Sequence, residues 1–408
     1  MSESKKNPFF PDIEKFDYII AGCGLAGCSL LMHMMLHSYF SSKKILVIDK
    51  ADKIDNDHTW CFWEKQQGVF EQIVYHSWNH LDFFSESFSG RFNISPYQYK
   101  MIRSIDLYNC VLQKAKQQSN IYFYYGNITG VTSEKNCAAI NVDGLKFTAS
   151  YVFNSIVFNG NIFSSPSARF HFLWQHFKGW YIQTPSEVFD ETIATFMDFR
   201  VLQNNETIFV YVLPFSKTQA LIEYTLFSKK LLKSNEYDDA LKNYISQYLK
   251  ITNYKITNEE FGIIPMTDYK FPAGRNNIIN IGTAGAQVKP SSGFAFQFIQ
   301  KHSVAIVKAL MSNKNLLNLR AFADKRFHIY DATLLSILES KKLSGQQIFS
   351  MLFKKNPPQR ILKFLDNETV LSEELKIMRS VPSKVFLPAA LKFFLNHNIV
   401  SKVIKNKK

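Results

Sequence analysis

A glycine-rich segment close to the N-terminus has the residue types and the spacing that bind a phosphate-linked cofactor: Gly22-Cys23-Gly24-Leu25-Ala26-Gly27. Gly22 permits a tight turn, Gly24 lets the backbone approach a pyrophosphate, and Gly27 lets the following helix pack on the preceding strand. The helix predicted after this loop would add amide donors and a partial positive charge toward the phosphates, and Leu25 and Ala26 belong to the same predicted site. The segment therefore predicts a dinucleotide-binding site.

The elements that must position this loop follow one another in the expected order. Residues 16–21 are predicted to form a short buried strand, residues 28–36 a helix, and residues 44–49 a second strand that ends in a carboxylate. Asp49 would accept hydrogen bonds from ribose hydroxyls, and the adjacent Lys50 belongs to the same predicted site. FAD and NAD both fit this unit, although its position near the N-terminus favours FAD. The sequence has no second GxGxxG, so NADPH would bind only transiently or act through another reductase.

A second predicted cofactor contact lies near residue 290. Residues 277–282 form a predicted buried strand and residues 295–310 a predicted helix. The small residues between them create another helix N-terminus, which could hold a phosphate or the edge of a flavin ring. The predicted contacts are Gly282, Pro290, Ser291, Ser292 and Gly293.

Glu223 lies on a predicted hairpin whose strands are residues 211–213 and 220–227. Strand alternation places it on one face with the apolar Leu221 and Phe227. A carboxyl group among such neighbours is costly to bury, which favours a functional role. The alternative is that Glu223 faces water, as most glutamates on strands do.

Asp198, Arg103 and Asp106 are charged residues that each have two interpretations. Asp198 is a second candidate carboxyl, and the alternative is a structural ion pair with Arg200. Arg103 and Asp106 would order the cofactor edge or cap a helix. The ten histidines show no metal-binding spacing, so no metal site is predicted.

Length and composition set the frame for these motifs. A chain of 408 residues with 46% hydrophobic and 20% charged residues is typical of a globular protein with two or three lobes. No stretch is apolar enough to span a bilayer, and residues 1–15 lack the apolar core of a signal peptide. The five cysteines form no CxxC pair, which favours a reducing cytoplasm.

The positive charge is concentrated at the C-terminal end. Residues 301–408 contain 20 Lys and Arg against 7 Asp and Glu, so this region carries nearly all of the net charge of +14. An apolar tract at 385–395, followed by Lys402, Lys405, Lys407 and Lys408, is typical of a helix in a membrane interface. The alternative is a core-facing helix with a solvated charged end. Nucleic acid is not an expected partner, because no recognition motif accompanies the charge.

Several blocks together resemble the lycopene beta-cyclases, a family of FAD-dependent carotenoid cyclases. Many flavoproteins share the glycine loop, whereas the combination of the other blocks is specific and follows the family order. The other blocks are residues 56–63, 196–200, 221–225, 262–267 and 288–296.

The resemblance implies an α/β (α+β two-domain) flavin hydroxylase-like fold, with a Rossmann-type FAD-binding domain and an antiparallel sheet that covers the substrate. It implies reduced FAD, with NADPH as electron source. It also implies that the ends of lycopene and related linear carotenoids are closed to β-ionone rings without net redox change. Under this resemblance Glu223 becomes the expected general acid and Asp198 the second candidate. The related flavin hydroxylases usually have Asp after Gly282, where this chain has Thr283.

We expect a discontinuous FAD-binding domain at 16–80, 97–165 and 260–330, and a substrate sheet at 81–96 and 166–259. A basic helical cap at 331–408 would dock the protein on the inner face of the cell membrane. Two other functions fit the sequence. One is a different flavoprotein of this fold that reduces or hydroxylates an isoprenoid, and the other is a flavin-binding membrane protein without catalysis.

Overall fold

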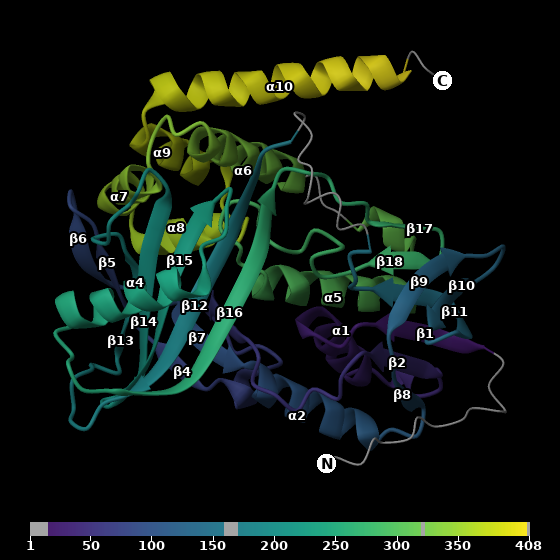
Figure 1. The fold of residues 1–408 in the computed structure, drawn as a ribbon. Helices are drawn as coiled ribbons and strands as arrows, with labels where there is room; N and C mark the ends of the chain where they lie inside the picture. The colour runs from purple at the N-terminus through teal and green to yellow at the C-terminus, as the bar shows by residue number, and fades with distance from the viewer. Residues whose placement is uncertain (1–14, 159–169, 320–322, 406–408) are drawn as a thin grey trace.

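The computed structural model describes residues 15–158, 170–319 and 323–405. Two lobes lie side by side, each built on a large sheet, and helices from the C-terminal end cover one of them (Figure 1). Some predicted parts lie outside the described residues. They are Lys407 and Lys408 and the parts of the predicted domains at 159–165, 320–322 and 406–408.

The first lobe is a parallel sheet with the predicted Rossmann-type connectivity. Its parallel strands have the order β18-β11-β1-β2-β8, and β17 extends one edge. They are β1 (Phe16–Ala21), β2 (Ile45–Asp49), β8 (Ile121–Tyr125), β11 (Leu145–Asn154), β17 (Gly274–Arg275) and β18 (Ile278–Asn280). The central strands are almost fully buried because both faces of the sheet are covered.

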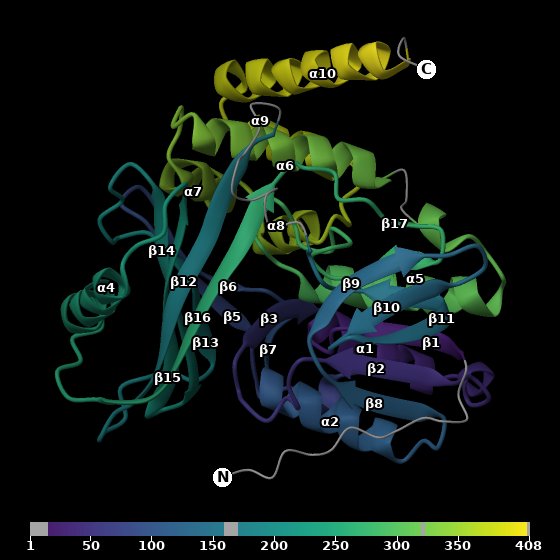
Figure 2. The same cartoon turned by 45° about the vertical axis from the view of Figure 1, so that its right-hand side comes forward.

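Helices cover one face of this sheet and a small antiparallel layer covers the other (Figure 2). The helices are α1 (Leu25–Met35), α2 (Ser104–Lys116) and α5 (Phe296–Met311), and the layer is β9 (Ile128–Ser133) with β10 (Ala138–Val142). Successive residues of β1 alternate between these layers: Tyr18 and Ile20 pack on the helices, and Ile19 packs on the antiparallel layer. Three short 3₁₀ helices connect elements at η1 (Ser38–Phe40), η2 (Glu71–Ile73) and η3 (Leu316–Asn318).

The second lobe is a seven-stranded sheet in the order β16-β12-β15-β14-β13-β5-β6. Its strands are β5 (His80–Phe84), β6 (Ser89–Asn93), β12 (Phe172–Gln183), β13 (Ile193–Asp198), β14 (Thr207–Ser216), β15 (Gln219–Ser228) and β16 (Lys255–Thr267). Helix α4 (Ser234–Gln247) covers its outer face, where Ile222 and Tyr224 pack. The inner face carries Leu221 and Phe227 in a separate core, so the predicted hairpin and its two faces are confirmed.

A three-stranded sheet joins the lobes: β3 (Thr59–Glu64), β4 (His76–Trp78) and β7 (Gln98–Arg103). Phe62 and Ile102 point into the core of the first lobe, whereas Trp63 and Met101 point into the core of the second. Strand alternation therefore lets this small sheet belong to both cores and hold them together.

The C-terminal helices form the predicted helical part of the chain. They are α6 (Ala323–Glu339), α7 (Gly345–Lys355), α8 (Pro358–Leu365), α9 (Leu371–Ser380) and α10 (Ser383–Lys405). Phe349, Phe353 and Leu362 bury their side chains in the core under the seven-stranded sheet. Helix α10 crosses α6 as the outermost layer of the molecule (Figures 1 and 2). Within the described residues, no helix has both the length and the apolar character needed to cross a bilayer.

Two element boundaries differ from the expected domain limits. Strand β16 continues to Thr267 because it pairs with β12 over its whole length, so the substrate sheet extends past the expected boundary at 259. Helix α6 begins at Ala323, ahead of the expected start of the cap at 331.

Candidate functional site

One cavity of about 530 Å³ extends from the glycine loop of the first lobe to the inner face of the second sheet. Strands β3, β12, β15 and β16 contribute to its wall, together with the starts of α1 and α5. Eight residues predicted from the sequence line it: Gly24, Leu25, Ala26, Lys50, Glu223, Gly282, Ser292 and Gly293. The fold thus joins residues separated by more than 250 positions in one chamber.

The glycine loop has the geometry that its sequence predicts. A Cβ atom on Gly27 would lie 2.1 Å from the carbonyl oxygen of Gly22, so the helix approaches the turn closely only without a side chain there. A Cβ on Gly24 would meet nothing within 4 Å. Helix α1 starts at Leu25 without a side-chain cap and without an acidic residue in its first turn. Its first amides are therefore available to an anion in the cavity.

The segment before α5 provides a second polar end of the same cavity. Helix α5 also starts without a side-chain cap or an acidic first turn. The Ser292 hydroxyl and the Gln175 side-chain oxygen line the cavity and are buried with no hydrogen-bond partner in the described part of the chain. Two uncapped helix starts and two buried polar atoms without partners fit a polar, anionic cofactor of dinucleotide size.

Two of the predicted contacts are engaged elsewhere. The Asp49 carboxylate accepts a hydrogen bond of 2.6 Å from the backbone N–H of Cys23 and pairs with Lys53 at 3.0 Å. Arg103 pairs with Asp106 at 2.6 Å at the start of α2, which is the helix-end alternative considered from the sequence. Neither Asp49 nor Arg103 is among the residues that line the cavity.

The predicted contacts at 290–293 also divide into residues that line the cavity and residues that do not. Ser291 donates its hydroxyl to Asp331 at 2.6 Å, away from the cavity, and Pro290 does not line it. Gly22 and Gly27 contact each other within the loop and do not line the cavity. Lys53, which the sequence analysis did not select, lines the cavity beside Lys50. Its only sequence signal is its position just after the acidic strand end.

Glu223 faces the cavity from β15 and meets a second carboxyl group, that of Glu260 on β16. Both residues stand opposite Gly179 of β12, which pairs with both strands. The two carboxyl groups are close enough for each to shift the pKa of the other. Thr225 donates its hydroxyl to Glu223 Oε1 at 2.6 Å, and Thr59 donates to Glu260 Oε2 at 2.6 Å.

This environment gives the carboxyl groups of Glu223 and Glu260 different affinities for a proton. Burial, together with the neighbouring charge of Glu260, raises the pKa of Glu223 to about 8. Burial also raises the pKa of Glu260, but the hydrogen bond from Thr59 and the nearby His58 oppose that rise. Near pH 7 Glu223 therefore keeps its proton, and the groups around Glu260 favour a negative charge of the pair on that residue.

Glu260 was not predicted from the sequence. It lies two residues before the 262–267 block that carries part of the family resemblance, and it follows another glutamate, Glu259. Alternation alone could not tell which of these two meets Glu223.

Comparison with known proteins identifies the family of this chain. Residues 17–390 match the family described as "Lycopene cyclase protein". The chain belongs to the lycopene cyclase family. No curated protein matches this lycopene cyclase family member.

Solved structures share the fold of this lycopene cyclase chain at low sequence identity. A geranylgeranyl bacteriochlorophyll reductase-like protein from Thermoplasma acidophilum is 13% identical, with a TM-score of 0.62 over 94% of this chain and 99% of that one. A flavoprotein/dehydrogenase from Cytophaga hutchinsonii is 12% identical, with a TM-score of 0.63 over 94% and 100%. A flavin-dependent brominase is 11% identical, with a TM-score of 0.57 over 96% and 100%. The chain thus has the two-domain, flavin hydroxylase-like fold that its sequence predicts.

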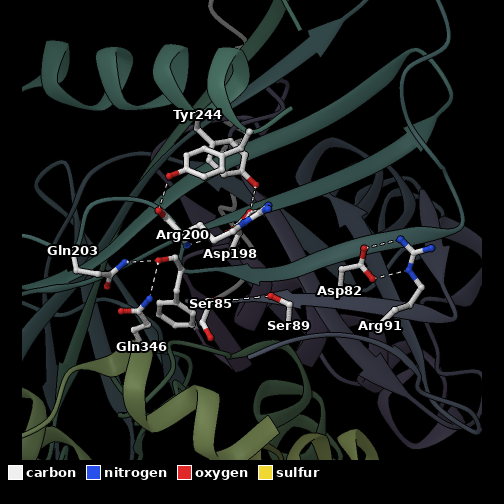
Figure 3. Close-up of polar contacts among 11 residues, drawn as sticks. Asp82, Ser85, Ser89, Arg91, Asp198, Arg200, Gln203, Tyr244 and Gln346 are labelled. Carbon is white, nitrogen blue, oxygen red and sulfur yellow. Dashed lines mark hydrogen bonds and ion pairs between the residues drawn. The ribbon is translucent and has the colours of Figure 1, made fainter. Parts of the chain in front are cut away.

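Asp198 of this lycopene cyclase chain does not reach the cavity. Its carboxylate is fully buried, pairs with Arg200 and accepts a hydrogen bond of 2.7 Å from Tyr244 of α4 (Figure 3). The interpretation of Asp198 as a second acid is therefore corrected: the Asp198–Arg200 pair is the structural alternative. The physical reason is that the end of β13 lies beneath α4, on the side of the sheet away from Glu223.

Aromatic side chains dominate the wall near Glu223 in this family member. Trp60, Tyr99, Phe177, Tyr211 and Phe294 line the cavity. Trp63 is a core residue that donates its indole N–H to the carbonyl of Leu362. Across the described ranges, no group of His, Cys, Asp or Glu side chains could hold a metal ion.

Proposed function

We propose that this chain is a lycopene beta-cyclase, which closes the linear ends of lycopene into β-ionone rings and forms γ-carotene and then β-carotene. The observation that supports this function best is Glu223, a carboxyl group kept protonated near neutral pH and facing an aromatic cavity. An alkene is a very weak base, so its protonation requires an acid that is neutral, buried and in direct contact.

The proposed reaction uses Glu223 as both acid and base. Its carboxyl proton is transferred to the terminal double bond, which leaves a positive charge on the tertiary carbon. The neighbouring double bond then attacks that carbon, so that one carbon–carbon bond closes the ring and the charge moves to a ring carbon. Loss of a proton from the adjacent carbon to the Glu223 carboxylate restores the acid, and the product is an isomer of the substrate.

The cavity wall would stabilise the positive charge and exclude water. The faces of Trp60, Tyr99 and Tyr211 can each contribute about 0.5–2 kcal/mol to a nearby cation. Leu213, Leu221 and Phe294 leave few polar atoms that could hold a water molecule to trap the cation.

FAD is the proposed cofactor, since the polar end of the cavity fits it. The amides of Leu25 and Ala26 would hold the diphosphate, and Lys50, Thr283 and Ser292 would contact its other polar groups. When bound in its reduced form, with NADPH as the proposed electron source, FAD would supply negative charge near the cationic carbon without net redox change. A flavin used in this way is not consumed.

A lipid surface is the proposed partner, because lycopene does not dissolve in water. Leu387, Leu391, Phe394 and Leu395 form a stripe on α10 that is 46% to 63% exposed, and Ala389 and Phe393 anchor the opposite side of the helix. Lys384 and Lys392 flank the stripe and would attract anionic headgroups. On the outer side of α9, Leu371, Leu375 and Met378 form a second exposed row. We accordingly propose peripheral attachment to the inner face of the cell membrane.

The test is the carotenoid product formed by the purified protein. The protein would be loaded with FAD, reduced with NADPH under nitrogen, and supplied with lycopene in phospholipid vesicles. A beta-cyclase yields γ- and β-carotene with the mass of lycopene, and NADPH is not consumed in proportion to product. A heavier product with proportional NADPH use would instead identify a reductase or hydroxylase, and unchanged lycopene would identify a non-catalytic flavoprotein.

A further inference from the structure

The contact between Glu223 and Glu260 depends on the absence of a side chain between them. Gly179 stands between the two residues on the middle strand. A Cβ atom there would lie 2.9 Å from Cγ and 3.3 Å from Oε1 of Glu260. The site therefore has room for two carboxyl groups to meet only because residue 179 is glycine.

A short chain of hydroxyl groups directs its hydrogen atoms toward Glu260. The Tyr181 hydroxyl lies 2.5 Å from Thr59 Oγ1, which in turn donates to Glu260 Oε2. Because Thr59 uses its own hydrogen atom on the carboxylate, Tyr181 is the donor in the other contact. A carboxyl oxygen that accepts such a bond favours the ionised form. Glu223 also accepts one, from Thr225, but Glu260 has in addition the Tyr181 donor behind Thr59 and the nearby His58, so Glu260 carries the charge of the pair.

The other titratable groups around the pair do not compete for this role. Burial raises the pKa of the Cys61 thiol and of the Tyr99, Tyr181 and Tyr211 hydroxyls, so these four stay neutral at pH 7. Two groups of other types act on this network: His58, whose side chain is 53% exposed, lowers the pKa of Glu260, and Arg103 lowers the pKa of Tyr181. Glu260 is thus the negative charge that faces Glu223.

We infer that Glu260 is a positioning residue for the proposed acid: its carboxylate, held by Thr59, accepts the hydrogen bond through which Glu223 keeps its proton. This inference rests on the proposed function for its catalytic meaning. Glu260 itself need not touch the substrate. Its effect is to keep Glu223 protonated at a pH where a lone carboxyl group at this site would lose more of its protons.

The decisive measurement is an infrared titration of the flavin-loaded protein without lycopene. The protonated carboxyl band that disappears in Glu223→Gln identifies Glu223. In Glu260→Gln the midpoint of that band should fall by about 1–2 pH units, because the like charge and the acceptor are gone. Glu259→Gln is the matched control, since Glu259 lies on the opposite face and pairs with Lys178 at 3.0 Å, and it should leave the midpoint unchanged. An unchanged midpoint in Glu260→Gln overturns the inference.

A second variant gives a shift of the opposite sign. Thr59→Val removes the donor that stabilises ionised Glu260, so the midpoint of the protonated carboxyl band should rise to higher pH. Thr59→Ser keeps a hydroxyl donor and should restore the original midpoint. A loss of packing alone would not move the midpoint in opposite directions in the two variants. If Glu260→Gln fails to fold, an unchanged midpoint in Thr59→Val overturns the inference. If the shifts occur but the wild type forms no rings, the proposed function fails while the pair itself stands.

Discussion

Lys289 and Asp331 form a buried ion pair of 2.8 Å that ties the cavity segment before α5 to helix α6 of the C-terminal region. The ammonium also donates to Asn367 and lies 5.8 Å from the rings of Phe327 and Phe364. Asp331 accepts in addition from Ser291, so three residues outside the cavity hold Ser292 and Gly293 at its wall. The C-terminal helices are therefore part of the cofactor end of the molecule.

Replacing Asp331 by Asn should destabilise the protein strongly. The change leaves Lys289 buried with an uncompensated charge, which costs about 3–5 kcal/mol in the free energy of unfolding. Urea denaturation measures this loss. The control is Glu187→Gln, which removes the exposed pair with Lys217 and should cost less than about 1 kcal/mol. Equal losses in the two variants would contradict the structural role of Asp331.

Glu223→Gln should abolish ring formation while the protein keeps its flavin. The amide has nearly the shape of the acid but cannot transfer a proton to the alkene, so the rate of ring closure should fall by about 10²–10⁴-fold. Chromatography of the carotenoid products measures the loss, and flavin absorbance measures the cofactor. Glu259→Gln, which changes a glutamate one residue from Glu260 but outside the cavity, should cyclise normally. Normal cyclisation by Glu223→Gln would refute the acid assignment.

Ring formation should decline as the pH rises through about 8. The pKa of Glu223 is raised to about 8, so the acid is protonated below that value and ionised above it. The active form is the protonated one, which gives the loss of rate on the alkaline side of the profile. Initial rates of product formation between pH 6 and 10, at saturating reduced FAD, check this sign. A rate that rises through this range would mean that the essential group acts as a base.

Two glycine substitutions in the phosphate loop should have different consequences. Gly27→Ala forces a methyl group to within 2.1 Å of the Gly22 carbonyl oxygen and should prevent the loop from forming, with loss of stability and of flavin. Gly24→Ala places its methyl group in open space at the cavity wall, so the apoprotein should keep its melting temperature but retain less flavin. Thermal unfolding and flavin content distinguish the two. Gly130→Ala, where a Cβ also meets nothing, should change neither quantity.

Two aspartates on the outer stripe of α10 should weaken lipid binding. The double variant Leu387→Asp and Leu391→Asp puts negative charge on a surface proposed to face anionic headgroups, without touching the packed Ala389 and Phe393. Flotation with vesicles that contain anionic lipid should show the loss, while flavin content remains unchanged. Leu202→Asp, at an equally exposed leucine outside these helices, should still float. Unchanged flotation of the double variant would place lipid binding elsewhere.

Local sequence patterns determined much of this fold. The glycine loop, the two flanking strands and the hairpin at 207–228 were predictable because each follows from short-range rules of spacing, alternation and turn geometry. The shared face of Glu223, Leu221 and Phe227 was predictable for the same reason, and the family resemblance made Glu223 the expected acid. Asp198 was not, because the same alternation leaves open whether a carboxylate meets a cavity or the underside of a helix.

Only the tertiary structure decided that Glu260, and not Glu259, is the partner of Glu223. Ile256 and Glu259 lie three residues apart on β16, yet both face α4. Regular alternation would place them on opposite faces, but the pairing of β16 with β12 shifts register between Tyr181 and Ile182. A bulge adds one residue to β16 there and turns every later side chain to the opposite face. The sequence by itself determined that Glu223 shares a face of its strand with Leu221 and Phe227. Which second carboxyl meets it depends on a register that long-range strand pairing sets, and no pattern within residues 255–267 encodes that pairing.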